Sequence, residues 1–554
     1  MPDFPMTLSD SRRPLRRAPV RHVSGRRPLV SVLLPTYNRP RYLAEALASA
    51  VRQTYRNLEI LVIRDGGEEV ADVVGSFHDA RVVFIDRKEN RGKPASLNEA
   101  LSRAQGKYVA YLDDDDLYYP HHVETLVNVL ERQTDFHVAY SDLYKTYWTA
   151  LPGLVAAERA SDRIALSKRV EISRDFDRFL MLYFNHVLHV SLMHRRDLLD
   201  RTGLYNESLN VLIDWDMTRR LAFFSDFLHV PAITGEFYSP IGACDRLSFQ
   251  GRQDPQEYLK NVLTIRTTRP PKPWTKIKDL SIILLVDRLD GDAVDTMRRI
   301  RRHTFYPYRL YVPHPQADRL QSRIRIPHIT FVPVENADTP GGWLDAAMRA
   351  CDGDYIAVVP GTLPVAEMWL ENALHALLKS TEPEGFFLEG ATPQLWSAVL
   401  RRTDLESARR AYPHLAIEAS LAAAGVPIRP PREEELPFQF DELLRQAKQA
   451  EANGDWTTTV RLCEHMTRHF QNDLWMKTMI AQAYLAAGDY ARAELLSHQI
   501  NEEQPTVDTL LLEARVHRRK KDYPRAIHLL RQAGEWLKSP VPPPIPAEEN
   551  SCPA

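Results

Sequence analysis

The sequence predicts an α/β protein with two sheet-containing domains, followed by an all-α region. Strand-like and helix-like segments alternate between residues 29 and 112, which is typical of a parallel-rich sheet. A similar succession returns between residues 276 and 430. After residue 438 the patterning is helical, and a short motif recurs at intervals of 34 and 33 residues. Together these observations predict three folded parts.

The length and composition are those of a multidomain globular chain. Its 554 residues exceed what one core supports, and 44% of them are hydrophobic. A net charge of -2 creates no field that favours nucleic acid, so we expect no such partner. The four cysteines lie far apart, and no apolar run resembles a membrane span or a signal core. We therefore expect a reduced, cytoplasmic setting.

Residues 1–28 form an arginine-rich arm. We expect a disordered, solubilising segment. The alternative is attraction to anionic lipid headgroups, which would give a peripheral contact at the inner face of the membrane.

The first predicted domain covers residues 29–265. Its strands are expected at 30–35, 58–63, 81–85 and 106–112, with helices between them. The carboxyl ends of parallel strands meet at one edge of a sheet, where ligands usually bind. Three polar segments follow these strands and should converge there: 36–39, Asp65 and 113–116.

Residues 113–116 are four consecutive aspartates that directly follow a strand. Four like charges repel one another, so a fold keeps them together only in water or around a cation. Carboxylates that leave coordination positions open suit Mg²⁺ or Mn²⁺ holding the phosphates of a substrate. A solvated acidic turn is the simpler alternative, but the position at a strand end favours the cation.

Four motifs in this order resemble family 2 glycosyltransferases of the GT-A fold, a Rossmann-like nucleotide-diphospho-sugar transferase fold. The motifs are V-S-V-L-L-P-T-Y-N-R (30–39), I-R-D-G-G (63–67), N-R-G-K-P-A-S-L-N (90–98) and Y-L-D-D-D-D (111–116). The resemblance implies a nucleotide-sugar donor, with a UDP-sugar favoured, and a Mg²⁺ or Mn²⁺ cofactor.

The resemblance also implies roles for single residues. Asp113 and Asp115 match the D-x-D metal motif. Asp65 would bind the base of the nucleotide, and Lys93 would lie near the base or the diphosphate. Arg64 departs from the family pattern, in which an acidic residue is common at this position. The donor-binding set would be Pro35, Thr36, Tyr37, Arg39, Asp65, Lys93 and Asp114.

Asp214 aligns with the catalytic base of the family, although Ile213 replaces the usual preceding acid. An inverting transfer needs one carboxylate to take the proton of the acceptor hydroxyl. The alternative for Asp214 is a helix N-cap, which aspartate favours. Trp215, Asp216 and His189 are weaker candidates for acceptor contacts; Asp216 could be structural, and His189 a core histidine. No Q-x-x-R-W motif follows, which favours a single-addition enzyme over a processive synthase.

Residues 266–275 form a proline-rich linker, and residues 276–430 resemble the first domain again. Pro360-Gly361-Thr362-Leu363 occupies the place of the four aspartates. We interpret this domain as a degenerate GT-A-like domain with a structural, dimer-forming or acceptor-binding role. An unrelated α/β domain is the alternative, since α/β repeats resemble one another.

Residues 431–437 form a second linker, and residues 438–538 resemble tetratricopeptide repeats (TPR). Gly454-Asp455-Trp456, Gly488-Asp489-Tyr490 and Lys521-Asp522-Tyr523 mark the three copies. Such stacks bind peptides or partner proteins; the alternative is a helical cap that packs on the preceding domain. Residues 539–554 form a polyproline-like tail that we expect to be disordered.

The sequence therefore predicts a metal-dependent, inverting, non-processive glycosyltransferase. It would move a sugar from a nucleotide-sugar donor to a hydroxyl acceptor on a cell-surface glycan, a lipid-linked saccharide or a glycoprotein. A homodimer is a further expectation. One alternative is a catalytically weak scaffold that acts through its repeats. Another is a sugar nucleotidyltransferase, but residues 30–40 lack the glycine-rich activating loop that it needs.

Overall fold

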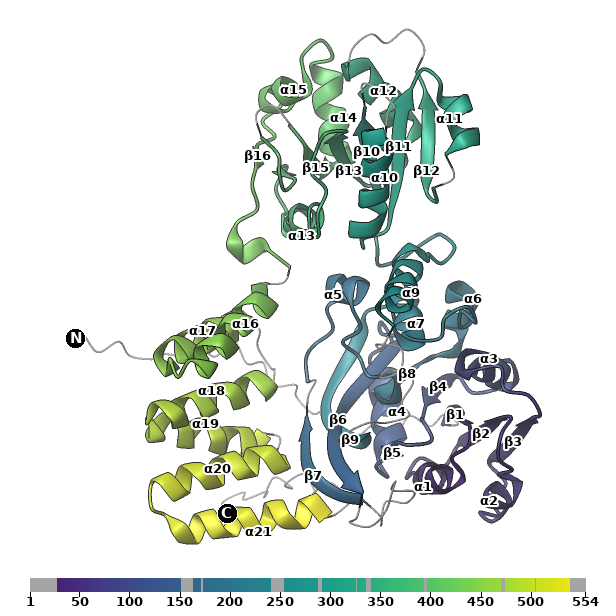
Figure 1. The fold of residues 1–554 in the computed structure, drawn as a ribbon, viewed down its shortest axis with the longest axis vertical. Coiled ribbons are helices and arrows are strands. Elements are labelled where there is room, and N and C mark those ends of the chain that lie inside the picture. The colour runs from purple at the N-terminus through teal and green to yellow at the C-terminus, as the bar shows by residue number, and fades with distance from the viewer. Residues whose placement is uncertain are drawn as a thin grey trace, which may run out of the picture.

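The structure is a computed structural model in which three folded parts are seen (Figure 1). Most of the arginine-rich arm and the whole proline-rich tail lie outside the described residues. Those residues are 27–150, 163–170, 173–240, 254–286, 291–324, 326–334, 340–392, 396–437, 439–469, 474–503 and 505–538.

The first part is built on a nine-stranded sheet in the order β3-β2-β1-β4-β8-β6-β9-β5, with β7 paired to β6. Strands β3, β2, β1 and β4 run parallel, and β8 is antiparallel to β4. The strands are β1 (Val30–Thr36), β2 (Leu58–Asp65), β3 (Val82–Arg87), β4 (Tyr108–Tyr111), β5 (Leu117–Tyr118), β6 (Val138–Ala150), β7 (Arg163–Val170), β8 (Leu192–Arg195) and β9 (Phe227–Pro240). Every residue of β1 is buried, as expected for the centre of such a sheet.

The helices of this part cover both faces of the sheet. Helix α1 begins with Pro40 and α3 has Pro94 in its first turn, where a missing N–H is harmless. The helices are α1 (Pro40–Val51), α2 (Ala71–Gly75), α3 (Lys93–Arg103), α4 (His122–Arg132), α5 (Arg178–Tyr183), α6 (Leu199–Thr202), α7 (Ile213–Leu221) and α9 (Pro255–Thr267).

The second part repeats the topology of the first. Its sheet order, β12-β11-β10-β13-β15-β14-β16, matches β3-β2-β1-β4-β8-β6-β9 strand for strand. The registers agree too: Tyr108 pairs with Val30 and Arg195, and Tyr355 pairs with Leu280 and Arg401. The strands are β10 (Leu280–Leu285), β11 (Tyr308–His314), β12 (Ile329–Pro333), β13 (Tyr355–Pro360), β14 (Gly385–Phe387), β15 (Ala398–Arg401) and β16 (Ile428–Arg429). The predicted second α/β domain is confirmed, and Pro360 stands where the first domain has Asp113.

Six helices complete the second part, which shares one hydrophobic core with the first. Buried residues of both sheets and of α7 belong to the same cluster, including Leu33, Met217, Phe305 and Val359. The helices are α10 (Gly291–His303), α11 (Ala317–Arg323), α12 (Pro340–Ala350), α13 (Glu371–Lys379), α14 (Arg402–Ala411) and α15 (Ile417–Ala423), of which α14 and α15 lie beside β16 (Figure 1).

The third part is a stack of helices in which each helix contacts the next. The three predicted motif copies fall at equivalent turns: Gly454, Gly488 and Lys521 all have positive φ. The aspartate that follows each of them accepts a hydrogen bond from a backbone N–H three residues later. The helices are α16 (Gln439–Ala452), α17 (Trp456–His469), α18 (Leu474–Ala487), α19 (Tyr490–Glu503), α20 (Val507–Arg519) and α21 (Tyr523–Lys538).

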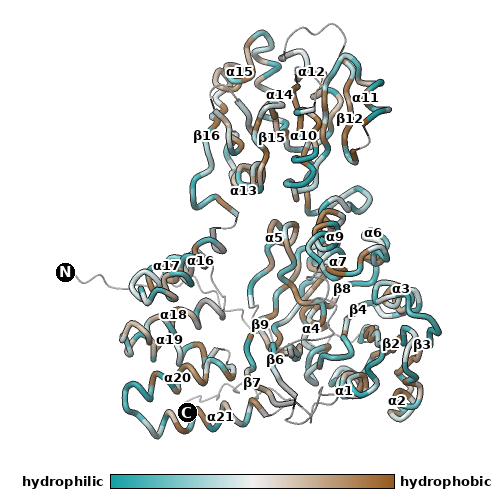
Figure 2. Tube along the Cα trace, viewed as in Figure 1, coloured by the Kyte–Doolittle hydropathy of each residue, from teal (hydrophilic) through white to brown (hydrophobic). Residues whose placement is uncertain are grey.

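One face of this stack packs against β6, β7 and β9 of the first part (Figures 1 and 2). Ala481, Ile500 and Leu512 form a cluster with Tyr144 and Val170. The stack therefore packs on the first part, as the predicted helical cap would, and binding of a peptide or partner protein stays a prediction. Among the described residues, none of the helices combines the length and hydropathy that crossing a bilayer requires.

Candidate active site

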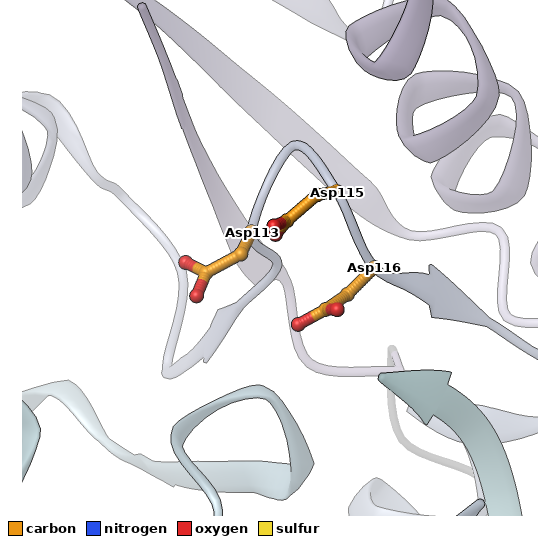
Figure 3. Close-up of side chains that lie close together, drawn as sticks. All are labelled: Asp113, Asp115 and Asp116. Carbon is orange, nitrogen blue, oxygen red and sulfur yellow. The ribbon is translucent and has the colours of Figure 1, made fainter. Parts of the chain in front are cut away.

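The four aspartates form the loop between β4 and β5, at the carboxyl end of the parallel strands (Figure 3). The backbone turns here, because the Asp116 N–H donates to the Asp113 carbonyl over 3.1 Å. The turn brings Asp113, Asp115 and Asp116 together, with one carboxylate oxygen of each within 4.8 Å of the others. Asp116 was not among the predicted ligands, and the unbroken run of aspartates was the signal that could have included it.

This oxygen cluster fits a hard divalent cation, which prefers carboxylate ligands. The chain's own cations already neutralise part of its charge. The Lys93 ammonium lies 2.5 Å from Asp113. The Arg39 guanidinium lies 3.3 Å from Asp114 and 3.2 Å from Asp115. Lys93 and Arg39 are thus placed beside any anionic group that binds at the loop.

Asp114 is outside the three-carboxylate cluster and anchors the loop to β1. Its Oδ2 accepts a hydrogen bond of 2.8 Å from the Thr36 hydroxyl, at the end of β1. Burial, followed by the charge of Asp115, raises the pKa of Asp114 to about 7, although Arg39 and Thr36 oppose the increase. Thr36 and Asp114 therefore join the tips of β1 and β4. Pro35 lies buried within β1, and Tyr37 is 46% exposed beyond it.

Asp65 ends β2 and holds the loop that follows β3. Its carboxylate lies 3.3 Å from the Arg87 guanidinium and accepts a 3.0 Å hydrogen bond from the Arg91 N–H. Arg64, the departure from the family pattern, has acidic partners of its own, because it lies 2.6 Å from Glu69 and 2.7 Å from Asp86. The substitution therefore leaves the position of Asp65 intact.

Asp214 lies in the first turn of α7, not at its N-cap. The N-cap is Leu212, whose left-handed backbone (φ 60°) starts the helix without a side-chain cap. The Asp214 Oδ2 accepts a 2.9 Å hydrogen bond from the Asn185 amide. Burial raises the pKa of Asp214, while the backbone N–H of Trp215, the charge of Lys93 and the Asn185 amide oppose the increase.

Lys93 connects the acidic loop with Asp214. Burial lowers the pKa of Lys93, but the charges of Asp113, Asp115 and Asp214 outweigh it and raise the pKa above its usual value. One ammonium group is therefore within electrostatic reach of both groups of carboxylates. Sequence spacing alone gave no sign of this, because Lys93 and Asp214 lie 121 residues apart.

The three candidates for acceptor contacts are buried. Trp215 donates to the Met181 carbonyl over 2.9 Å. Asp216 pairs with Arg220 over 2.7 Å and is 1% exposed, which favours its structural alternative. His189 stacks on Tyr111 at 4.1 Å and lies 2.7 Å from the Tyr205 hydroxyl. Burial lowers the pKa of His189 to about 3, as in a neutral core histidine.

Comparison with known proteins points to one family. Residues 31–171 match the model described as glycosyl transferase family 2. An uncharacterized glycosyltransferase of Rickettsia prowazekii is 29% identical over 191 residues, which are 34% of this chain and 57% of that protein. One of Bacillus subtilis is 28% identical over 194 residues, 35% of this chain and 68% of that protein. The chain thus spans little more than half the length of the Rickettsia relative.

Solved structures give a weaker likeness. Staphylococcus aureus TarS, residues 1–349 in complex with UDP-GlcNAc, has a TM-score of 0.34 and 17% identity. The match covers 43% of this chain and 65% of that one. The ordered motifs, the sheet that carries them and the family match over residues 31–171 agree with one another. Residues 31–171 are therefore similar to glycosyl transferase family 2.

Proposed function

We propose that this protein is a metal-dependent, inverting glycosyltransferase that adds a single sugar to a hydroxyl acceptor. The observation that carries the proposal is the position of Lys93, which lies 2.5 Å from Asp113 and within electrostatic reach of Asp214. A donor diphosphate needs positive charge, and an attacking hydroxyl needs a base. A cation held by the acidic loop would supply the first, Asp214 would supply the second, and the Lys93 ammonium lies within electrostatic reach of both.

The donor would bind at the tips of β1, β2 and β4. Thr36, Tyr37 and Asp65 lie at these tips, and Lys93 and Arg39 lie beside the acidic loop. Asp113, Asp115 and Asp116 would hold Mg²⁺ or Mn²⁺, which stabilises negative charge on a departing diphosphate. We favour a UDP-sugar as the donor.

Asp214 would act as the general base. The acceptor oxygen forms a bond to the anomeric carbon as the bond from that carbon to the diphosphate oxygen breaks. The hydroxyl proton passes to the Asp214 carboxylate, and the nucleoside diphosphate leaves with the electron pair of the broken bond. The Asn185 amide keeps Asp214 oriented, and Lys93 favours its charged form.

Ligand-dependent thermal stability tests the donor site directly. We expect one nucleotide among UDP, GDP, dTDP and CMP to raise the melting temperature only with Mn²⁺, because a ligand of the native state stabilises it by mass action. Asp115→Ala should abolish this shift, whereas Asp292→Ala, an exposed carboxylate of the second domain, should leave it unchanged. A folded wild-type chain that responds to none of the nucleotides would refute the proposal.

A further inference from the structure

Strand β9 holds the far end of the acidic loop. The loop leads into β5, where Leu117 lies opposite Glu236 of β9 in an antiparallel pair. Two residues further along β9, the N–H of Tyr238 donates to Oδ1 of Asp116 over 3.1 Å. Asp116 is one of the three clustered carboxylates, so β9 is in direct contact with the candidate metal site.

The two strands approach each other closely at Gly235 of β9. A Cβ added there would lie 2.5 Å from the Leu117 carbonyl oxygen, nearer than van der Waals contact allows. A glycine at this position is therefore what lets β9 pack against the residue that follows the four aspartates. Because no space is left between the strands, a displacement of β9 should be passed on to the acidic loop.

The side chain of Glu236 ties β9 to three neighbouring segments. Its Oε1 accepts from the Tyr119 hydroxyl over 2.6 Å, and its Oε2 accepts from the Thr146 hydroxyl of β6 over 2.8 Å. The ammonium group of Lys168, on β7, lies 2.5 Å from Oε1. Glu236 and Lys168 are both buried, so each of these bonds would be costly to leave unmade.

The helical stack packs on the same network. Tyr119, whose hydroxyl donates to Glu236, belongs to one hydrophobic cluster with Ala481 of α18, Ile500 of α19 and Leu512 of α20. Helices α20 and α21 also contact β7, and Figure 1 shows the stack beside this strand. A continuous set of packed side chains and hydrogen bonds therefore runs from the stack through Tyr119, Glu236 and β9 to the acidic loop.

We propose that Glu236 is a positioning residue for the metal site, and that the helical stack sets the affinity of the acidic loop for its cation through this network. The carboxylate of Glu236 is already engaged by its three partners, so it acts on the cation only through β9 and Asp116. The inference rests on the proposed function, because it takes Asp113, Asp115 and Asp116 as the metal ligands.

Binding of Mn²⁺ alone to the full chain, measured by electron paramagnetic resonance of the free ion, tests the role of Glu236. Tyr119→Phe removes only the hydroxyl that donates to Glu236. It should raise the dissociation constant of Mn²⁺ about tenfold, the lower end of what the loss of an outer-shell partner costs a metal site. Tyr140→Phe is the matched control, since this buried hydroxyl donates to the Arg174 carbonyl instead and its loss should leave the affinity unchanged.

A second pair of variants tests the role of the stack. Leu512 and Leu510 are both buried on α20, but Leu510 belongs to a different cluster, which it shares with Leu529 of α21. Leu512→Ala and Leu510→Ala should both destabilise the stack, and only Leu512→Ala should also weaken Mn²⁺ binding. Combining Tyr119→Phe with Leu512→Ala should cost less affinity than the two single losses together, because both act through one network.

The same measurements separate this inference from the proposed function. Asp115→Ala should lose Mn²⁺ binding, as the proposed function requires. If Tyr119→Phe or Leu512→Ala then binds Mn²⁺ as tightly as the wild type, the inference is overturned while the proposed function stands. A folded wild-type chain that binds no Mn²⁺ would overturn both. Circular dichroism checks that each variant is folded.

Discussion

Removing the Asn185 side chain should move the pH dependence of sugar transfer. The Asn185 amide donates to the Asp214 carboxylate over 2.9 Å, and its own oxygen accepts from the Val187 N–H, which fixes its orientation. A hydrogen bond to a charged group is worth roughly 1.5–3 kcal/mol, and one pKa unit corresponds to about 1.4 kcal/mol. Asn185→Ala should therefore raise the pKa of Asp214 by about one unit or more.

If Asp214 is the base, only its deprotonated form is active. The acid limb of the profile of kcat against pH should then move to higher pH by the same amount in Asn185→Ala, while the plateau at high pH changes less. The assay is release of the nucleoside diphosphate from the donor over a range of pH. Asn128→Ala, an exposed position on α4, is the control.

Asp214→Asn completes this experiment. Turnover should fall by a factor of about a hundred or more, with donor affinity nearly unchanged. An acid limb that stays in place in Asn185→Ala, together with turnover that survives Asp214→Asn, would refute the assignment of Asp214. Equal loss of donor binding in Asp214→Asn would instead make this residue part of the donor site.

Three further predictions concern stability and the donor loop. His229 lies 2.9 Å from Asp142 and 3.0 Å from Asp175, and although burial opposes them, these carboxylates raise the pKa of His229 to about 9. The ion pairs stabilise the fold by roughly 3 kcal/mol at most; this contribution is fully present below the unfolded pKa of about 6.5 and is lost as pH rises towards 9. In His229→Gln, the free energy of unfolding measured in urea should therefore change less between these pH values. An unchanged dependence on pH would count against the ion pairs. Arg219→Met should lower the free energy of unfolding by about 3 kcal/mol or more, because the fully buried guanidinium donates to the carbonyls of Thr268, Arg266 and Phe305. Arg298→Met, at an exposed position, is its control. Equal unfolding midpoints for the two variants would contradict the reasoning. Gly66→Ala should weaken donor binding in calorimetry, because Gly66 has φ +72° and its Cβ would lie 2.8 Å from the Asn90 backbone nitrogen; Gly75→Ala, with open space around it in α2, should leave affinity unchanged.

The sequence predicted the sheet and its duplication because both depend on local pattern. Strand alternation places Asp65 and the aspartate run at one edge, and the second copy of the pattern folds with the same strand order. Asp116 lies beside Asp113 and Asp115 because the backbone turns between Asp113 and Asp116. The D-x-D spacing in the sequence does not reveal this turn. The assignments of Asp113, Asp115 and Asp214 stay predictions until they are measured.

The three acceptor candidates are buried, and their assignment stays a prediction. Trp215 and Asp216 directly follow Asp214 in the sequence, but their side chains, like that of His189, have partners in the core. Whether a polar side chain faces a ligand or a neighbouring helix depends on packing between elements far apart in the chain. The helical stack shows the same limit, since its contact with β7 joins segments more than 300 residues apart.

The second α/β domain is tied to the first through α7. The amino end of this helix carries Asp214, and the carboxyl end carries Arg219, which is fully buried and donates to carbonyls of the linker and of the second domain. Arg220 holds the middle of the helix to Asp216 and to the Thr202 carbonyl. A helix fixed in this way cannot shift without breaking buried hydrogen bonds at its far end, each of which is costly to leave unmade. The second domain, which has Pro360 and Gly361 where the first has aspartates, therefore stabilises the helix that positions Asp214.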